Sequence, residues 1–224
     1  MNNCYLDAEA VITFFRMTGR KHIFITGSRG SGKSHLVNNM LKHMSDSFNL
    51  LQSHRTDTPQ VVIKSNLVAD NKEFVIGVPR TSGINPASKG NNMTIIEDGF
   101  INCAIPAIDT HLDTTPERLF VIDELGYLES SCIPFQKAVE KLLDNSHVLA
   151  VIRKQSTEFL NRICNRKDVL VIDIDNTFET LSCIIMASGM SKRFGSNKLI
   201  TDFNGRPLFE NAVSISHFAG FGET

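Results

Sequence analysis

Residues 27–34 have the composition and spacing of a phosphate-binding loop. They read Gly-Ser-Arg-Gly-Ser-Gly-Lys-Ser and match the pattern G-x-x-x-x-G-K-[ST] at every defined position. Glycines allow successive backbone N–H groups to converge on a phosphate, and the following helix points its positive end at the same anion. The lysine of this pattern reaches the β- and γ-phosphates, and the last hydroxyl coordinates Mg²⁺. The motif predicts that a nucleoside triphosphate is bound by Gly27, Ser28, Arg29, Gly30, Ser31, Gly32, Lys33 and Ser34, with Lys33 also catalytic and Ser34 a metal ligand.

Two adjacent carboxylates, Asp123 and Glu124, follow the apolar residues 119–122. Ligand chemistry in open α/β sheets takes place at the carboxyl ends of strands. We expect Asp123 to hold Mg²⁺, directly or through water, and Glu124 to polarise an attacking water, which a hydrolase needs. The alternative is a solvated strand end, since Asp and Glu are common there. The upstream glycine-rich loop favours the functional interpretation.

An arginine that neutralises charge on a γ-phosphate can raise the rate of hydrolysis by about 10³–10⁵-fold. Arg153 directly follows the apolar residues 148–152 and is our first candidate for this catalytic role. Arg80, Arg162 and Arg166 lie in segments expected to be loops. A solvated surface position is the alternative for each of the four.

A second glycine-containing segment, residues 187–199, follows the apolar residues 183–186. Here Gly189 would present backbone amides to a triphosphate, and Arg193 and Lys198 would offset its charge. The alternative is a flexible basic linker.

Apolar strands alternate with amphipathic helices between residues 22 and 174, which predicts an α/β domain with a mostly parallel sheet covered by helices on both faces. The strands are expected at residues 22–26, 61–64, 74–78, 94–97, 119–122, 148–152 and 169–174. Residues 49–60 are polar and predicted to be a loop. The pattern restarts with a strand at residues 183–186, so we divide the chain into domains at residues 1–179 and 180–224.

Composition excludes several other classes of protein. The formal net charge is −1, so no overall field recruits nucleic acid or an acidic membrane. The five cysteines are scattered without a C-x-x-C pair, which favours neither a disulfide framework nor a zinc site. We see no signal peptide and no apolar run of about 18 residues. We therefore expect a cytoplasmic protein without a membrane partner.

Residues 121–129, Val-Ile-Asp-Glu-Leu-Gly-Tyr-Leu-Glu, follow this phosphate loop in a way that resembles the cancer-related nucleoside-triphosphatase family. The second motif of that family reads D-E-[IL]-G followed by an acidic residue. The resemblance covers about residues 21–178. It implies a RecA-like P-loop NTPase fold and Mg²⁺-dependent hydrolysis of ATP, GTP or another nucleoside 5′-triphosphate to diphosphate and phosphate. It carries over to Gly27, Gly32, Lys33, Ser34, Asp123, Glu124 and Glu129.

Residues 187–199, with Gly205-Arg206-Pro207-Leu208, resemble the opening motifs A-A-G-x-S-x-R-M-G-x-x-K-x-L and G-[KR]-P-L of the molybdenum-cofactor cytidylyl- and guanylyltransferases. The resemblance implies an incomplete, Rossmann-like nucleotidyltransferase segment. Residues 181–224 are too few for that fold and lack its later acidic residues, so transferase activity is expected only in a longer parent protein.

Three functions of the first domain fit these motifs: a nucleoside-triphosphate hydrolase, a nucleotide kinase, and a nucleotide-binding switch. Adjacent Asp123 and Glu124 favour water as the acceptor, and hence the hydrolase.

Overall fold

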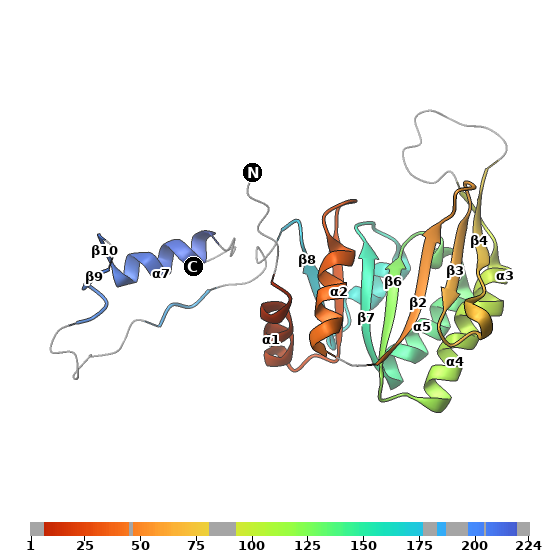
Figure 1. Ribbon diagram of the computed structural model, residues 1–224, viewed down its shortest axis with the longest axis horizontal. Helices are drawn as coiled ribbons and strands as arrows, with labels where there is room; N and C mark the ends of the chain where they lie inside the picture. The colour runs from red at the N-terminus through yellow and green to blue at the C-terminus, as the bar shows by residue number, and fades with distance from the viewer. Residues whose placement is uncertain are drawn as a thin grey trace. The chain divides into compact units, whose positions relative to one another are not determined.

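The computed structural model describes residues 7–44, 47–80, 93–176, 183–186, 197–203 and 205–218. The chain divides into two compact units, Met1–Ile174 and Asp175–Thr224. The first unit is built on an eight-stranded sheet in the order β5-β4-β3-β2-β6-β7-β1-β8 (Figure 1). The predicted domain boundary between residues 179 and 180 stays a prediction.

The strands of this sheet are β1 (His22–Gly27), β2 (Phe48–Arg55), β3 (Val61–Ser65), β4 (Phe74–Pro79), β5 (Met93–Ile95), β6 (Leu119–Leu125), β7 (His147–Arg153) and β8 (Val169–Asp173). The helices are α1 (Ala8–Thr18), α2 (Lys33–Met44), α3 (Glu97–Gly99), α4 (Ile105–Thr114), α5 (Ile133–Asn145) and α6 (Glu158–Cys164), with the short helical segments η1 (Ala69–Asn71), η2 (Phe100–Ala104) and η3 (Glu129–Ser131).

Five neighbouring strands, β2, β6, β7, β1 and β8, run parallel to one another. Strands β3, β4 and β5 extend the sheet beyond β2 with antiparallel pairing. The predicted α/β fold, with a mostly parallel sheet between layers of helices, is therefore confirmed. Parallel pairing places the carboxyl ends of β2, β6, β7 and β1 at one edge of the sheet.

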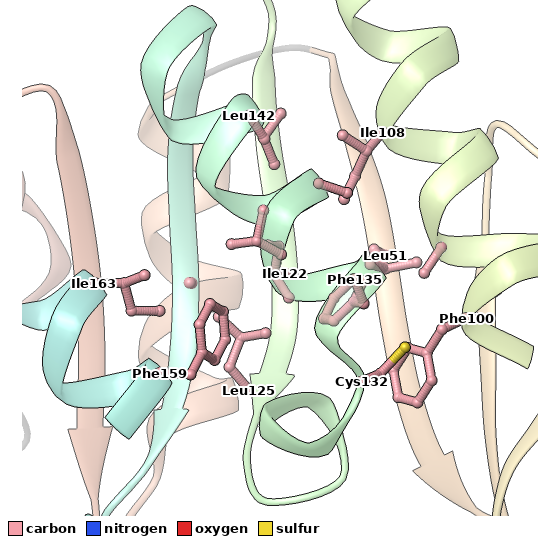
Figure 2. Packing of buried hydrophobic residues seen from close by; sticks show 14 of the residues in the cluster. Leu51, Phe100, Ile108, Ile122, Leu125, Cys132, Phe135, Leu142, Phe159 and Ile163 are labelled. Atoms are coloured by element: carbon pink, nitrogen blue, oxygen red, sulfur yellow. The ribbon is translucent and has the colours of Figure 1, made fainter. Parts of the chain in front are cut away.

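Helices cover both faces of the sheet because its strands are apolar on both sides (Figure 1). In β1, Ile23 and Ile25 belong to a cluster with α1 and α2, whereas Phe24 belongs to the cluster on the other face. That second cluster contains the fully buried Phe135 of α5 and Phe159 of α6, whose rings Figure 2 shows beside the sheet. This packing buries β1, β6 and β7 on both faces.

A buried polar network fixes the first part of β2. Asn49 Nδ2 donates to His111 Nδ1 at 2.8 Å, and His111 Nε2 lies 2.6 Å from Ser146 Oγ. Ser146 Oγ donates its own proton to Pro116 O at 2.8 Å, so His111 Nε2–H is the donor to Ser146. Burial lowers the pKa of His111, in keeping with this neutral tautomer. The network joins β2 to α4 and to the segment before β7.

Three sequence-based assignments need correction. Residues 49–60 were predicted to be a loop but contain most of β2. The polar side chains of this strand form hydrogen bonds to other elements, as Asn49 does with His111 and Gln52 with Asp123. The short helix α6 was not predicted at all. Residues 183–186 form no strand, and Ile184 and Met186 are both 86% exposed. No strand of the described residues pairs with them.

The second unit contains the short antiparallel pair β9 (Asp202–Phe203) and β10 (Arg206–Pro207), followed by α7 (Leu208–Phe218). Gly205, with φ 81°, closes the turn between the two strands by donating its N–H to Asp202 Oδ1 at 2.9 Å. Lys198 lies in the turn before β9. Gly189 and Arg193 of the predicted second phosphate loop lie outside the described residues. Among the described helices of the chain, none is long and apolar enough to cross a membrane.

All eight strands of the large sheet precede residue 174, so we expect the first unit to fold without the second. A chain that ends at residue 179 should keep most of the melting enthalpy of the full chain in differential scanning calorimetry. A control chain that ends at residue 166 lacks β8, which pairs with β1 from His22 to Thr26, and should lose cooperative melting. Unfolding of the first truncation would mean that residues after 179 complete the core.

Candidate active site

The carboxyl ends of β1, β2, β6 and β7 surround a cavity of about 640 Å³, called here the central cavity. Its lining combines the glycine-rich loop after β1, the acidic end of β6 and cationic side chains from β2 and β7. The lining residues are Gly27, Ser28, Arg29, Gly30, Lys33, Ser34, Gln52, Ser53, His54, Arg55, Val61, Asp123, Glu124, Tyr127, Leu128, Glu129, Val151, Arg153, Lys154 and Gln155.

The loop between β1 and α2 folds around the Lys33 ammonium group. Lys33 Nζ donates to Gly27 O at 2.8 Å and to Ser28 O at 2.7 Å. Gly30 and Gly32 have φ of 78° and 95°, a left-handed conformation that other residues rarely adopt. Helix α2 begins at Lys33 and carries no acidic residue in its first turn, so its positive end is not offset locally. Of the eight predicted loop residues, Ser31 and Gly32 are not among those that line the cavity.

Asp123 and Glu124 lie where β6 leaves its regular pairing with β7. Asp123 is opposite Gln52 of β2, whose Nε2 donates to Asp123 Oδ2 at 2.8 Å. Glu124 has φ 90°, which a residue with a side chain adopts at a cost of about 1–3 kcal/mol. The amide of Gln52 orients the Asp123 carboxylate, and the strained backbone directs the Glu124 side chain.

Arg153 lies between the glycine-rich loop and the acidic pair because β7 lies between β1 and β6. Arg153 is opposite Gly27 in the sheet, and its Nε forms an ion pair with Glu124 Oε1. A β-carbon at Gly126 would lie 2.8 Å from Arg153 Cδ, so this close approach depends on glycine. The first arginine candidate thus contacts the predicted base directly.

Glu129 is buried at 5% exposure and holds the turn after β6. Its Oε2 accepts the Gly126 N–H at 2.9 Å, and its Oε1 accepts from Ser53 Oγ at 3.4 Å. Burial raises the pKa of the Glu129 carboxyl more than these hydrogen bonds lower it. Glu129 therefore joins the end of β2 to the turn that carries Gly126.

The other arginine candidates separate into two groups. Arg162 pairs with Glu140, and Arg166 pairs with Asp144 and Asp168, all away from the lining of the central cavity. Burial raises the pKa of the Tyr127 phenol, and the nearby charges of Arg55 and Arg80 offset part of that rise.

Sequence reasoning missed the polar lining that β2 provides, from Gln52 to Arg55. It also missed Lys154, directly after β7, whose Nζ lies 2.7 Å from Asp173 Oδ2. The apolar residues Phe48, Leu50 and Leu51 were the available signal for β2.

Ser34 and Asp123 both line the central cavity and offer a hydroxyl and a carboxylate oxygen. Mg²⁺ in phosphoryl-transfer sites takes one or two protein oxygens and completes its shell with phosphates and water. This donor set fits such an ion. Within the described ranges, no group of three or more His, Cys, Asp or Glu side chains could hold a metal without a substrate.

Comparisons with known proteins show the family of the chain. Residues 22–181 match the model of a family described as NTPase. The chain is 26% identical over 155 residues to the nucleoside-triphosphatase THEP1 of Thermotoga sp. strain RQ2, covering 68% of this chain and 86% of the relative. It is 23% identical over 154 residues to the enzyme of the same name from Thermotoga maritima, an alignment that covers 68% of this chain and 86% of the relative.

Two solved structures share the fold. The crystal structure of THEP1 from Aquifex aeolicus superimposes with a TM-score of 0.54 at 18% identity, covering 68% of this chain and 89% of that one. The solution structure of a human cancer-related nucleoside triphosphatase gives a TM-score of 0.51 at 18% identity, covering 89% and 98%.

We expect Glu129→Gln to stabilise the protein above pH 4.5. With a raised pKa, the native state binds more protons than the unfolded state, so stability falls as pH rises from 4.5 through the native pKa. The glutamine amide can keep the Gly126 bond through its oxygen and donate to Ser53. Urea unfolding between pH 5 and 8 should show a flatter dependence than in the wild type.

The control is Asp57→Asn at an exposed carboxylate, which should keep the wild-type pH profile. Equal pH profiles of the Glu129→Gln variant and the wild type would contradict the role given to Glu129.

Proposed function

The chain belongs to the NTPase family, and on that premise we propose that it hydrolyses nucleoside 5′-triphosphates to diphosphate and phosphate in the central cavity. The curated relatives carry the name nucleoside-triphosphatase, which supports this activity. The observation that carries the proposal is the gathering of Lys33, Asp123, Glu124 and Arg153 around one cavity.

The glycine-rich loop and Lys33 are proposed to bind the β- and γ-phosphates. Backbone N–H groups at the start of α2 and the Lys33 ammonium provide positive charge to a triphosphate. The Lys33 ammonium already contacts the carbonyl groups of Gly27 and Ser28, so it is positioned before the nucleotide binds. Ser34 and Asp123 would hold Mg²⁺. A bound Mg²⁺ would neutralise part of the negative charge of the phosphates.

Glu124 is proposed to accept a proton from the attacking water. The water oxygen forms a bond to the γ-phosphorus, the bond from that phosphorus to the β,γ-bridging oxygen breaks, and the diphosphate leaves with the electron pair. The ion pair with Arg153 and the backbone at φ 90° both hold the Glu124 carboxylate at the cavity. A carboxylate beside the Mg²⁺-holding Asp123 favours water over a second substrate as the acceptor.

We further propose that residues 180–224 are the start of a nucleotidyltransferase domain, in which Lys198 binds a phosphate group of the nucleotide. This proposal rests on the sequence motifs of residues 187–199 and 205–208. We also propose a cytoplasmic location, because Cys103, Cys132, Cys164 and Cys183 are all free thiols, as expected in a reducing compartment.

An assay of phosphate and pyrophosphate release over a panel of nucleoside triphosphates tests the proposal. Hydrolysis at the central cavity releases phosphate, whereas nucleotidyl transfer releases pyrophosphate. Phosphate that appears only with an added small-molecule acceptor would indicate a kinase, and binding without either product would indicate a switch.

Lys33→Ala should weaken the binding of Mg²⁺-nucleoside triphosphate by about ten- to hundredfold, because it removes a charge-assisted contact to the phosphates. Isothermal titration with a non-hydrolysable triphosphate measures the effect. Lys42→Ala on the same helix removes an exposed lysine that contacts Asn39, and it should bind as the wild type does. Unchanged affinity in Lys33→Ala would contradict the assignment of the loop.

Glu124→Gln should lower kcat by about 10²–10⁴-fold, because an amide cannot take the proton of water. The affinity for the non-hydrolysable triphosphate should stay within a few-fold of the wild type, since Asp123 and the loop are intact. Glu158→Gln, at a fully exposed position of α6, serves as the control. A wild-type rate in Glu124→Gln would exclude the general-base role and favour a switch.

A further inference from the structure

Arg55 ends β2 at the central cavity, on the side away from the glycine-rich loop. Strands β6 and β7 separate β2 from β1 in the sheet. Gln52 is opposite Asp123, so Arg55 lies three residues farther along β2, or about 10 Å beyond the acidic pair. Its side chain lines the same cavity as Lys33 and Glu124.

The cations around the central cavity differ in their partners. The ammonium of Lys33 contacts loop carbonyls, Lys154 pairs with Asp173, and Arg153 pairs with Glu124. In the part of the chain that the structure describes, no carboxylate lies within ion-pair distance of Arg55.

Like charges converge at this end of the cavity. Burial lowers the pKa of the Arg153 guanidinium, and repulsion from the nearby Arg55 and Arg29 lowers it further. Such a cluster is unfavourable until an anion enters it. The glycine-rich loop and α2 already provide positive charge for the β-phosphate. The guanidinium groups of Arg55 and Arg29 therefore add positive charge for the terminal phosphate of a triphosphate.

We propose that Arg55 binds the γ-phosphate and makes the central cavity select triphosphates over diphosphates. A guanidinium can form two parallel hydrogen bonds to phosphate oxygens, which gives directional recognition. Arg153, the first candidate from the sequence, instead orients Glu124. Arg55 is then the group that neutralises charge on the γ-phosphoryl as its bond to the diphosphate breaks. This inference rests on the proposed function, because it assigns a residue to the same reaction.

Calorimetric binding of a Mg²⁺-loaded β,γ-imido triphosphate and of the matching diphosphate tests the inference. Arg55→Ala should lower the affinity for the triphosphate by about ten- to hundredfold, as expected for a lost charge-assisted contact, and leave the affinity for the diphosphate within about twofold. Arg55→Lys keeps the charge but loses the paired hydrogen bonds, so its affinity for the triphosphate should lie between those of the wild type and Arg55→Ala. Arg162→Ala is the matched control, because Arg162 pairs with Glu140 of α5 away from the lining of the central cavity, and it should bind both nucleotides like the wild type.

Turnover provides a second measurement. Arg55→Ala should also lower kcat by at least about tenfold with an unchanged melting temperature, since Arg55 is exposed. Equal weakening of triphosphate and diphosphate, or wild-type affinity for both, would overturn the assignment. If the wild type binds the triphosphate but releases no phosphate, the proposed hydrolysis fails, while the binding comparison still decides the role of Arg55.

Discussion

Parallel pairing of β6, β7 and β1 is the constraint on which the candidate site depends. Because the three strands run in the same direction, the loop after β1, the carboxylates at the end of β6 and Arg153 at the end of β7 reach one edge of the sheet. The order β6-β7-β1 also sets their spacing, since one strand separates the acidic end from the phosphate-binding loop. The apolar burial of these strands on both faces serves to hold this arrangement.

The buried strands could be predicted from the sequence because burial on both faces leaves a nearly continuous apolar run, as in residues 22–26. Strand β2 could not, because its polar residues are satisfied by partners distant in the sequence, such as His111 for Asn49 and Asp123 for Gln52. Arg55 was not found because it ends this unpredicted strand. An apolar run alone was also misleading, since residues 183–186 have no neighbouring strand among the described residues.

The types of residue at the site could be predicted, but their interactions could not. The pattern of residues 27–34 and the pair Asp123-Glu124 each consist of contiguous residues, so both can be recognised without knowledge of the fold. The pairing of Arg153 with Glu124 and the contact between Ser53 and Glu129 join residues 29 and 76 positions apart in the chain. Such contacts depend on strand order, which a single sequence does not specify. The pairing of Arg153 with Glu124 also changes the role expected of Arg153, because an arginine that is paired with the proposed base is less available to a phosphate.

The positive φ of Glu124 places stability and turnover in direct competition at one residue. Glycine adopts this conformation without strain, so replacing Glu124 by glycine would relax the backbone and remove the proposed base in the same step. Laboratory evolution that rewards only heat resistance would therefore favour loss of the proposed base at this position. Engineering of a more robust variant has to keep residue 124 fixed and seek its gains in surface helices such as α1, whose residues do not line the central cavity.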